Sequence, residues 1–263
     1  MFATYWVLAC AISWLAYAFS APADSDAETV SALVRDPLGL VAKFGPSIAG
    51  VVVLAIPGAG ARILFWDAAR RLPAVLLAAA IGVPGAITLG SLWLAASVQG
   101  VDNSSLFAAF SLFGAVYWIA VKILLGGGLG EEIGVRGVAL PLLLDRMGPR
   151  LASLILGAAW ALWHLPALWG QPAVIWIAQL VLTVSVSVIL TFVWVRYGPS
   201  LLVAIIFHGA LNGWAAFAAA EWAPKIEALD EWQVIRLLAL SGLGIALLSL
   251  RWLPRNPEGE TSK

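Results

Sequence analysis

Two histidines, His164 and His208, are the residues of this 263-residue chain whose chemistry is most informative. Both fall inside long apolar stretches, where an ionisable side chain is costly to keep. A third polar cluster, formed by Glu131, Glu132 and Arg136, lies between glycine-rich and apolar sequence. Ionisable groups in such surroundings are candidates for function unless pairing explains them, so chemistry is expected at these residues.

The first motif is the sequence EEIGVR at positions 131–136. On a helix, positions four apart share a face, whereas neighbouring side chains point about 100° apart. We therefore expect Glu132 and Arg136 to form an ion pair, and Glu131 to point elsewhere, free to hold a water molecule or a metal ion. The alternative is a cytoplasmic loop in which both carboxylates are solvated and the arginine sets the membrane topology.

The second motif is the sequence WALWH at positions 160–164. Counted from a cytoplasmic boundary near Leu151, His164 lies roughly 20 Å along its helix at 1.5 Å per residue, which is deep in the apolar region. Trp160 lies one turn earlier on the same face and is expected to pack beside the imidazole. The alternative is a structural histidine that is hydrogen-bonded to a backbone carbonyl or a serine.

The third motif is the sequence FHGALN at positions 207–212. His208 and Asn212 are four residues apart, so one helix face presents an imidazole and a carboxamide. The competing interpretation is helix packing, because interhelical hydrogen bonds join membrane helices and Gly209 and Gly213 have the small-xxx-small spacing of close helix contacts. The two interpretations do not exclude each other.

The composition indicates a polytopic membrane protein. Apolar residues make up 62% of the chain and charged residues 11%, whereas a soluble domain is roughly half apolar and a quarter charged. Fifteen basic and fifteen acidic residues give a formal net charge of zero, so the charge does not indicate nucleic acid as a partner. The single cysteine, Cys10, excludes an internal disulfide and a cysteine-based zinc site. We expect Cys10 to face lipid or to pack.

The predicted fold class is an all-α transmembrane helical bundle with about eight spans, each of about 20 apolar residues. The glycine-rich sequence at 126–130 disfavours a continuous helix, because each glycine costs about 1 kcal/mol relative to alanine. We therefore expect a broken segment near 126–147, with a helix from Glu131 to about Asp145. A single membrane domain is expected over 1–253, followed by a short cytoplasmic tail at 254–263. The expected spans are 2–20, 44–60, 73–98, 105–125, 151–169, 172–195, 199–219 and 234–252.

The distribution of basic residues predicts the orientation. With these spans, ten Lys and Arg residues fall on the side of the termini and four, including Arg236, on the opposite side; the positive-inside rule then places both termini in the cytoplasm. Lys122 is expected to snorkel to the cytoplasmic interface from the end of its span. An alternative is that residues 1–20 are a cleaved signal peptide, because Ala16-Tyr17-Ala18 has the small residues of a cleavage site, although no basic segment precedes the apolar run.

Together, the three motifs supply a carboxylate, two imidazoles and an amide. Peptide-bond hydrolysis needs such groups, namely a base to activate water and donors to stabilise the oxyanion. Their order, Glu-Glu-x-x-x-Arg, then aromatic-x-x-x-His, then His-x-x-x-Asn, resembles the CPBP intramembrane proteases, which include CAAX prenyl endopeptidases and bacteriocin-processing and immunity proteins. The resemblance covers positions 131–212. The chain differs from the usual family pattern at Trp160, where phenylalanine is usual, and at Val135, where an aromatic residue often stands.

The resemblance implies a role for each motif residue. Glu131 and His164 would polarise the attacking water, and His208 and Asn212 would stabilise the tetrahedral oxyanion. The supporting residues would be Glu132 and Arg136, which fix the geometry of the first motif.

Whether the site holds a metal is open from sequence. Glu131, His164 and His208 could bind one zinc ion, since catalytic zinc sites use three protein ligands and a water molecule. The alternative is a metal-free site in which Glu131 is the general base.

The resemblance implies an endopeptidase of the cell membrane, with the lipid bilayer as its surroundings. Its substrate would be a membrane-associated or lipidated peptide, either a CAAX-type prenyl protein or a leader peptide. The alternatives are a non-catalytic immunity or chaperone-like protein, and a proton-coupled carrier, because carriers also bury Glu and His near the membrane midplane. The sequence does not determine the oligomeric state or the natural substrate.

Overall fold

The computed structural model is helical throughout the part of the chain that it describes, with no strand there. The described residues are 1–20, 36–56, 74–100, 104, 110–221 and 229–252. The predicted tail at 254–263 lies outside them. The long helices are α1 (Phe2–Phe19), α3 (Pro37–Leu54), α4 (Ala74–Val98), α6 (Leu112–Leu125), α9 (Pro149–Trp163), α10 (Ala173–Tyr197), α11 (Leu201–Glu221) and α12 (Leu229–Ser249). Shorter elements are α7 (Gly127–Gly134), a π-helical turn η1 (Val135–Ala139), α8 (Leu140–Leu144) and a 3₁₀ turn η2 (Leu165–Leu168).

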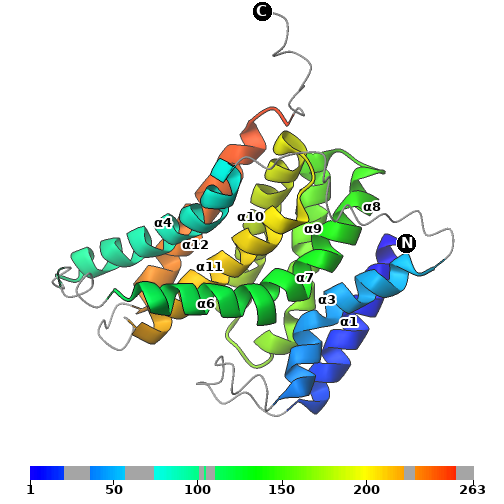
Figure 1. Cartoon of the computed structure of the whole chain (residues 1–263), viewed down its shortest axis with the longest axis horizontal. Helices are drawn as coiled ribbons and strands as arrows, with labels where there is room; N and C mark the ends of the chain where they lie inside the picture. Colours follow the sequence, from blue (N-terminus) through cyan, green and yellow to red (C-terminus); the bar gives the residue numbers. More distant parts are fainter. Residues whose placement is uncertain (21–35, 57–73, 101–103, 105–109, 222–228, 253–263) are drawn as a thin grey trace, which may run out of the picture.

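The expected all-α polytopic bundle is confirmed, and each of the eight predicted spans contains a helix (Figure 1). Six apolar helical stretches of the described chain are long enough to cross a membrane, and one of these runs from Leu112 to Leu144. The helix in the predicted span 151–169 ends earlier than expected, because α9 has only 15 residues and ends at Trp163. Pro166 follows, and a proline lacks the N–H that an α-helix needs to continue.

The outer surface of the bundle is apolar. Large hydrophobic side chains are exposed on helices that lie on the outside of the molecule. They include Phe19 on α1, Val98 on α4, Phe113 on α6, Ile177 on α10 and Ile245 on α12. An apolar surface of this extent is unusual for a soluble monomer and suits contact with lipid.

The chain breaks at one residue between α6 and α7. Gly126 has φ −113° and ψ −151°, and the helix resumes at Gly127. The predicted restart at Glu131 was therefore wrong by four residues. Close packing outweighs the low helix propensity of glycine here. A Cβ at Gly128 would lie 2.8 Å from the carbonyl oxygen of Ile123 and 3.0 Å from that of Ile205. Position 128 therefore has room for glycine but not for a side chain.

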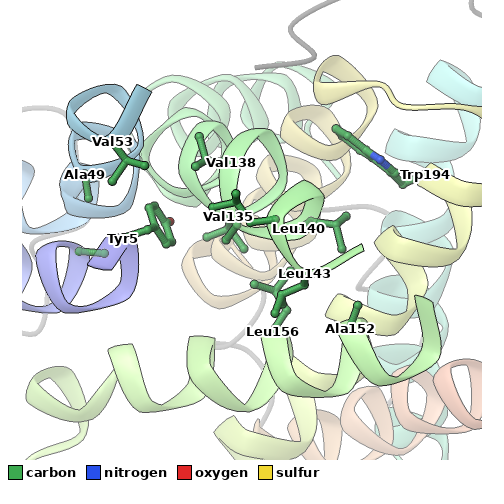
Figure 2. Packing of buried hydrophobic residues seen from close by; sticks show 13 residues of the cluster. Tyr5, Ala49, Val53, Val135, Val138, Leu140, Leu143, Ala152, Leu156 and Trp194 are labelled. Carbon is green, nitrogen blue, oxygen red and sulfur yellow. The ribbon is translucent and has the colours of Figure 1, made fainter. Parts of the chain in front are cut away.

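A buried apolar cluster fixes the segment that follows α7. Figure 2 shows Val135 and Val138 of the π-helical turn between Tyr5 of α1 and Val53 of α3 on one side, and Leu156 of α9 on the other. All five are almost fully buried. Between membrane helices, such contacts stabilise through van der Waals packing. The π-helical turn is thus held on both sides.

Helix α11 lies at the centre of the bundle and packs against α4, α6 and α7. Its contact with α6 depends on two glycines. A Cβ at Gly209 would lie 2.7 Å from the Cα of Ile123, and a Cβ at Gly213 would lie 2.5 Å from the Cα of Ile119. The helix-packing role expected for these glycines is therefore confirmed.

This contact predicts that Gly209→Ala destabilises the bundle by about 1–3 kcal/mol, because the added methyl group overpacks the α6–α11 interface. Thermal unfolding of the purified protein in detergent measures the effect. Gly242→Ala is the matched control, since a Cβ at that helical position meets nothing within 4 Å. Equal stability of the two variants would contradict the close packing described above.

Candidate active site

The three motifs meet at one cavity of about 390 Å³, which lies between helices of the bundle. Its lining includes Glu131 from α7, Trp160 and His164 from α9 and its C-terminal end, and His208 and Asn212 from α11. A cavity of this size is in the usual range for small-ligand sites. The four residues predicted to be catalytic, which are separated by up to 81 positions in the sequence, therefore border the same space.

Glu131 points into this cavity and is 6% exposed. Its Oε2 accepts a hydrogen bond from the indole Nε1 of Trp160 at 2.5 Å. Its Oε1 lies close to the imidazole of His208, because both border the same point above Gly127. A Cβ built at Gly127 would lie 2.9 Å from Oε1 of Glu131 and 2.3 Å from Nε2 of His208. Position 127 must therefore be glycine for the carboxylate and the imidazole to approach each other.

Glu132 is fully buried and does not line the cavity. Its Oε1 accepts from Nη1 of Arg136 at 2.8 Å, so the predicted i,i+4 ion pair is confirmed. The same oxygen is 2.7 Å from Nδ1 of His208 on α11. The sequence did not predict this second contact, which joins the first motif to the third and lets one carboxylate pair with a buried guanidinium and orient an imidazole.

Trp160 contacts four side chains of the three motifs: Glu131, Arg136, His164 and His208. Its ring lies edge-on to His208 with centroids 5.1 Å apart, and 6.0 Å from the ring of His164. The guanidinium of Arg136 lies 4.5 Å over its ring, in cation–π contact. The predicted packing of Trp160 beside His164 is confirmed, and the indole N–H gives Glu131 a donor that the more usual phenylalanine lacks.

The hydrogen-bond acceptors around the two imidazoles determine their tautomers. Nδ1 of His164 lies 2.8 Å from the carbonyl oxygen of Trp160, which can only accept, so Nδ1 carries the hydrogen. Nδ1 of His208 likewise carries a hydrogen when its partner Glu132 is ionised. Each neutral imidazole then presents Nε2 as an acceptor. The carbonyl contact expected for a structural histidine is thus present at His164, which also lines the cavity.

The residues proposed as zinc ligands have chemistry that suits a metal ion. Glu131, His164 and His208 each have one polar atom engaged by a neighbour, as is common for metal ligands. However, no three His, Cys, Asp or Glu side chains within the described part of the chain are grouped so that they could hold a metal ion.

Four further residues of the cavity, with basic or carboxamide side chains, were not predicted as part of a site. Lys122 of α6 is 7% exposed and lines the cavity, instead of snorkelling to the interface. Arg236 of α12 is also 7% exposed and lies inside a helix, although the sequence analysis used it only to assign topology. Gln179 and Gln233 complete the set. The sequence feature that could have identified Lys122 and Arg236 was a basic side chain within an apolar span.

Comparison with protein families gives a match over residues 112–214 to the family model described as Type II CAAX prenyl endopeptidase Rce1-like. The matched region runs from the start of α6 to the middle of α11 and contains all three motifs. No curated protein matches the chain. Residues 112–214 are therefore similar to the Rce1-like family, which confirms the resemblance to the CPBP family over this region.

The hydrogen bond to Glu131 predicts a stability effect for Trp160→Phe. This variant keeps an aromatic ring but removes the N–H donor, and a hydrogen bond to a charged group contributes about 1.5–3 kcal/mol. Denaturant unfolding followed by circular dichroism measures the loss. Trp176→Phe is the control, because its exposed indole donates only to the carbonyl of Gln171 at 3.2 Å. A loss at Trp160 no larger than at Trp176 would show that the bond to Glu131 is not stabilising.

Proposed function

We propose that this protein, through the Rce1-like domain at residues 112–214, hydrolyses a peptide bond in a membrane-associated substrate, using water activated by a carboxylate and an imidazole. The observation that carries the proposal is one cavity lined by Glu131, His164, His208 and Asn212 within a bundle of apolar helices. These groups match the requirements of amide hydrolysis: a base for the water and donors for the oxyanion.

Glu131 and His164 form the water-activating side of the site in this proposal. Oε2 of Glu131 is held by Trp160, which leaves Oε1 to accept a hydrogen bond from water. His164 presents Nε2 as an acceptor, because its Nδ1 hydrogen is directed to the carbonyl of Trp160. Two acceptors suit the two hydrogens of one water molecule. Transfer of one of these protons to Glu131 leaves a hydroxide to attack the scissile carbonyl carbon.

Asn212 and His208 form the oxyanion side. Attack moves the carbonyl π electrons onto oxygen, and the amide N–H₂ of Asn212 can donate to that charge directly. His208 donates from Nε2 when its ring carries both hydrogens, with Nδ1 held against Glu132. Collapse of the intermediate breaks the C–N bond, and the proton on Glu131 passes to the leaving amine. One water is consumed, and a carboxylic acid and an amine are released.

Glu132 and Arg136 are positioning residues in this scheme. Glu132 orients the imidazole of His208, and Arg136 pairs with the same oxygen at 2.8 Å. Neither residue is among those lining the cavity. Their contribution is to hold the oxyanion side rigid, which matters because small displacements of reacting groups cost large factors in rate.

The position of the cavity among apolar helices supports a membrane-associated substrate. A peptide must enter from lipid or from the membrane surface, which suits a prenylated C-terminal peptide or a membrane leader peptide. We also propose that both termini are cytoplasmic and that cleavage takes place near the cytoplasmic leaflet. The zinc alternative, with Glu131, His164 and His208 as ligands, is a separate proposal about the same chemistry.

The proposed base predicts the behaviour of Glu131→Gln. Turnover of a prenylated CAAX peptide or of a leader peptide by the reconstituted protein should fall at least about 100-fold, since general acid–base catalysis contributes about 10²–10⁴. Glu221→Gln, at the end of α11 and away from the cavity, is the carboxylate control and should keep full turnover. Wild-type turnover of Glu131→Gln would refute the assignment. Absence of cleavage by the wild type, with proton-dependent uptake into vesicles, would instead favour a carrier.

The metal-free scheme predicts that turnover does not depend on bound metal. Metal content of the purified protein, measured by mass spectrometry before and after chelator treatment, should be substoichiometric at full activity. Turnover that rises in proportion to bound zinc, and that is lost in chelator, would overturn the scheme with Glu131 as direct base. It would leave the assignment as a protease intact.

A further inference from the structure

The cavity has two basic side chains that the proposed mechanism does not use. Lys122 comes from α6 and Arg236 from α12, and each is 7% exposed. Among the described residues that line the cavity, Glu131 is the only carboxylate. Basic side chains that line a cavity among apolar helices are candidates for function.

The two cations lie beside the segments that carry the reacting groups. Lys122 is one turn before the break at Gly126, where a Cβ would lie 3.3 Å from Cδ of Lys122, and α7 with Glu131 begins at the next residue. Arg236 donates from Nη2 to the carbonyl oxygen of Leu211 at 3.0 Å, next to Asn212 in the chain. Both cations therefore lie beside segments that carry residues of the proposed site.

Both side chains have donor capacity for a ligand in addition to partners within the protein. A guanidinium carries five N–H donors and an ammonium three. A guanidinium also matches the geometry of a carboxylate, with which it forms paired, charge-assisted hydrogen bonds. The carboxamides of Gln179 and Gln233 line the same cavity and add neutral donors.

We propose that Lys122 and Arg236 form a subsite that binds a carboxylate of the peptide substrate, and this inference rests on the proposed function. The carboxylate is either the free C-terminus of the peptide or an acidic side chain near the cleaved bond. Because the cations share one cavity with Glu131 and Asn212, one peptide can reach both the cations and the proposed reacting groups. The subsite would fix where along the peptide cleavage occurs.

The test measures, by fluorescence anisotropy, how two prenylated peptides bind to the full chain in detergent. One peptide has a free C-terminal carboxylate, and the other is the same peptide with a C-terminal amide. The protein carries Glu131→Gln, so that binding is read without turnover. The acid should bind about 10–100-fold more tightly than the amide, as expected for hydrogen bonds to a charged group. Adding Arg236→Gln or Lys122→Gln should weaken binding of the acid and leave that of the amide unchanged. If the two C-terminal forms bind equally, but an amide peptide with Glu near the cleaved bond binds more tightly than the same peptide with Gln, the subsite binds an acidic side chain of the substrate.

Two controls separate the subsite from loss of fold. Arg196→Gln removes a guanidinium from α10 that does not line the cavity, and should leave the preference intact. Arg236→Lys keeps the charge and should retain part of it. Equal binding of acid, amide and Glu-containing peptides by the parent protein overturns the subsite, and so does an equal loss for acid and amide in both Gln variants. Cleavage without a carboxylate preference refutes the subsite alone, whereas the preference without cleavage by the wild type refutes only the proposed function.

Discussion

The site depends on how a carboxylate is kept buried among apolar helices. Glu132 is fully buried, and its Oε1 is shared by Arg136 at 2.8 Å and by His208 at 2.7 Å. Removal of one partner from a buried ion pair costs about 3–5 kcal/mol. The pairing therefore constrains two helices at once, because α7 supplies the carboxylate and α11 supplies the imidazole. Trp160 extends the cluster, since its ring contacts Arg136 and His208 while its N–H reaches Glu131.

Close backbone approach makes this cluster possible. The imidazole of His208 and the carboxylate of Glu131 meet over Gly127, where a side chain would collide with both. Directly after His208 on α11, Gly209 lets the helix touch the backbone of α6 at Ile123. Glycine is costly for helix stability in isolation, by about 1 kcal/mol. Here tertiary packing outweighs that cost, because closely packed helices can provide hydrogen-bond partners for each other's polar groups, which lipid cannot.

Local contacts of the site were predictable because helical spacing fixes them. The Glu132–Arg136 pair, the packing of Trp160 on His164 and the shared face of His208 and Asn212 all follow from positions four apart. The start of α7 was not predictable in the same way. Its glycines lower helix propensity, and only contact with Ile123 and Ile205 explains why they are helical. The length of α9 was also overestimated, because apolar residues continue past the point where Pro166 interrupts the hydrogen-bond pattern.

The sequence by itself determined that the chain is a polytopic helical membrane protein, and it identified the carboxylate, imidazole and amide groups that proved to line one cavity. These properties depend on composition and on spacing within single helices. The tertiary structure alone decided that Glu132 orients His208, that Trp160 holds Glu131, and that Lys122 and Arg236 share the cavity. Such contacts join helices that are distant in sequence, and the hydrophobic pattern states which residues are apolar but not which helix faces pack together.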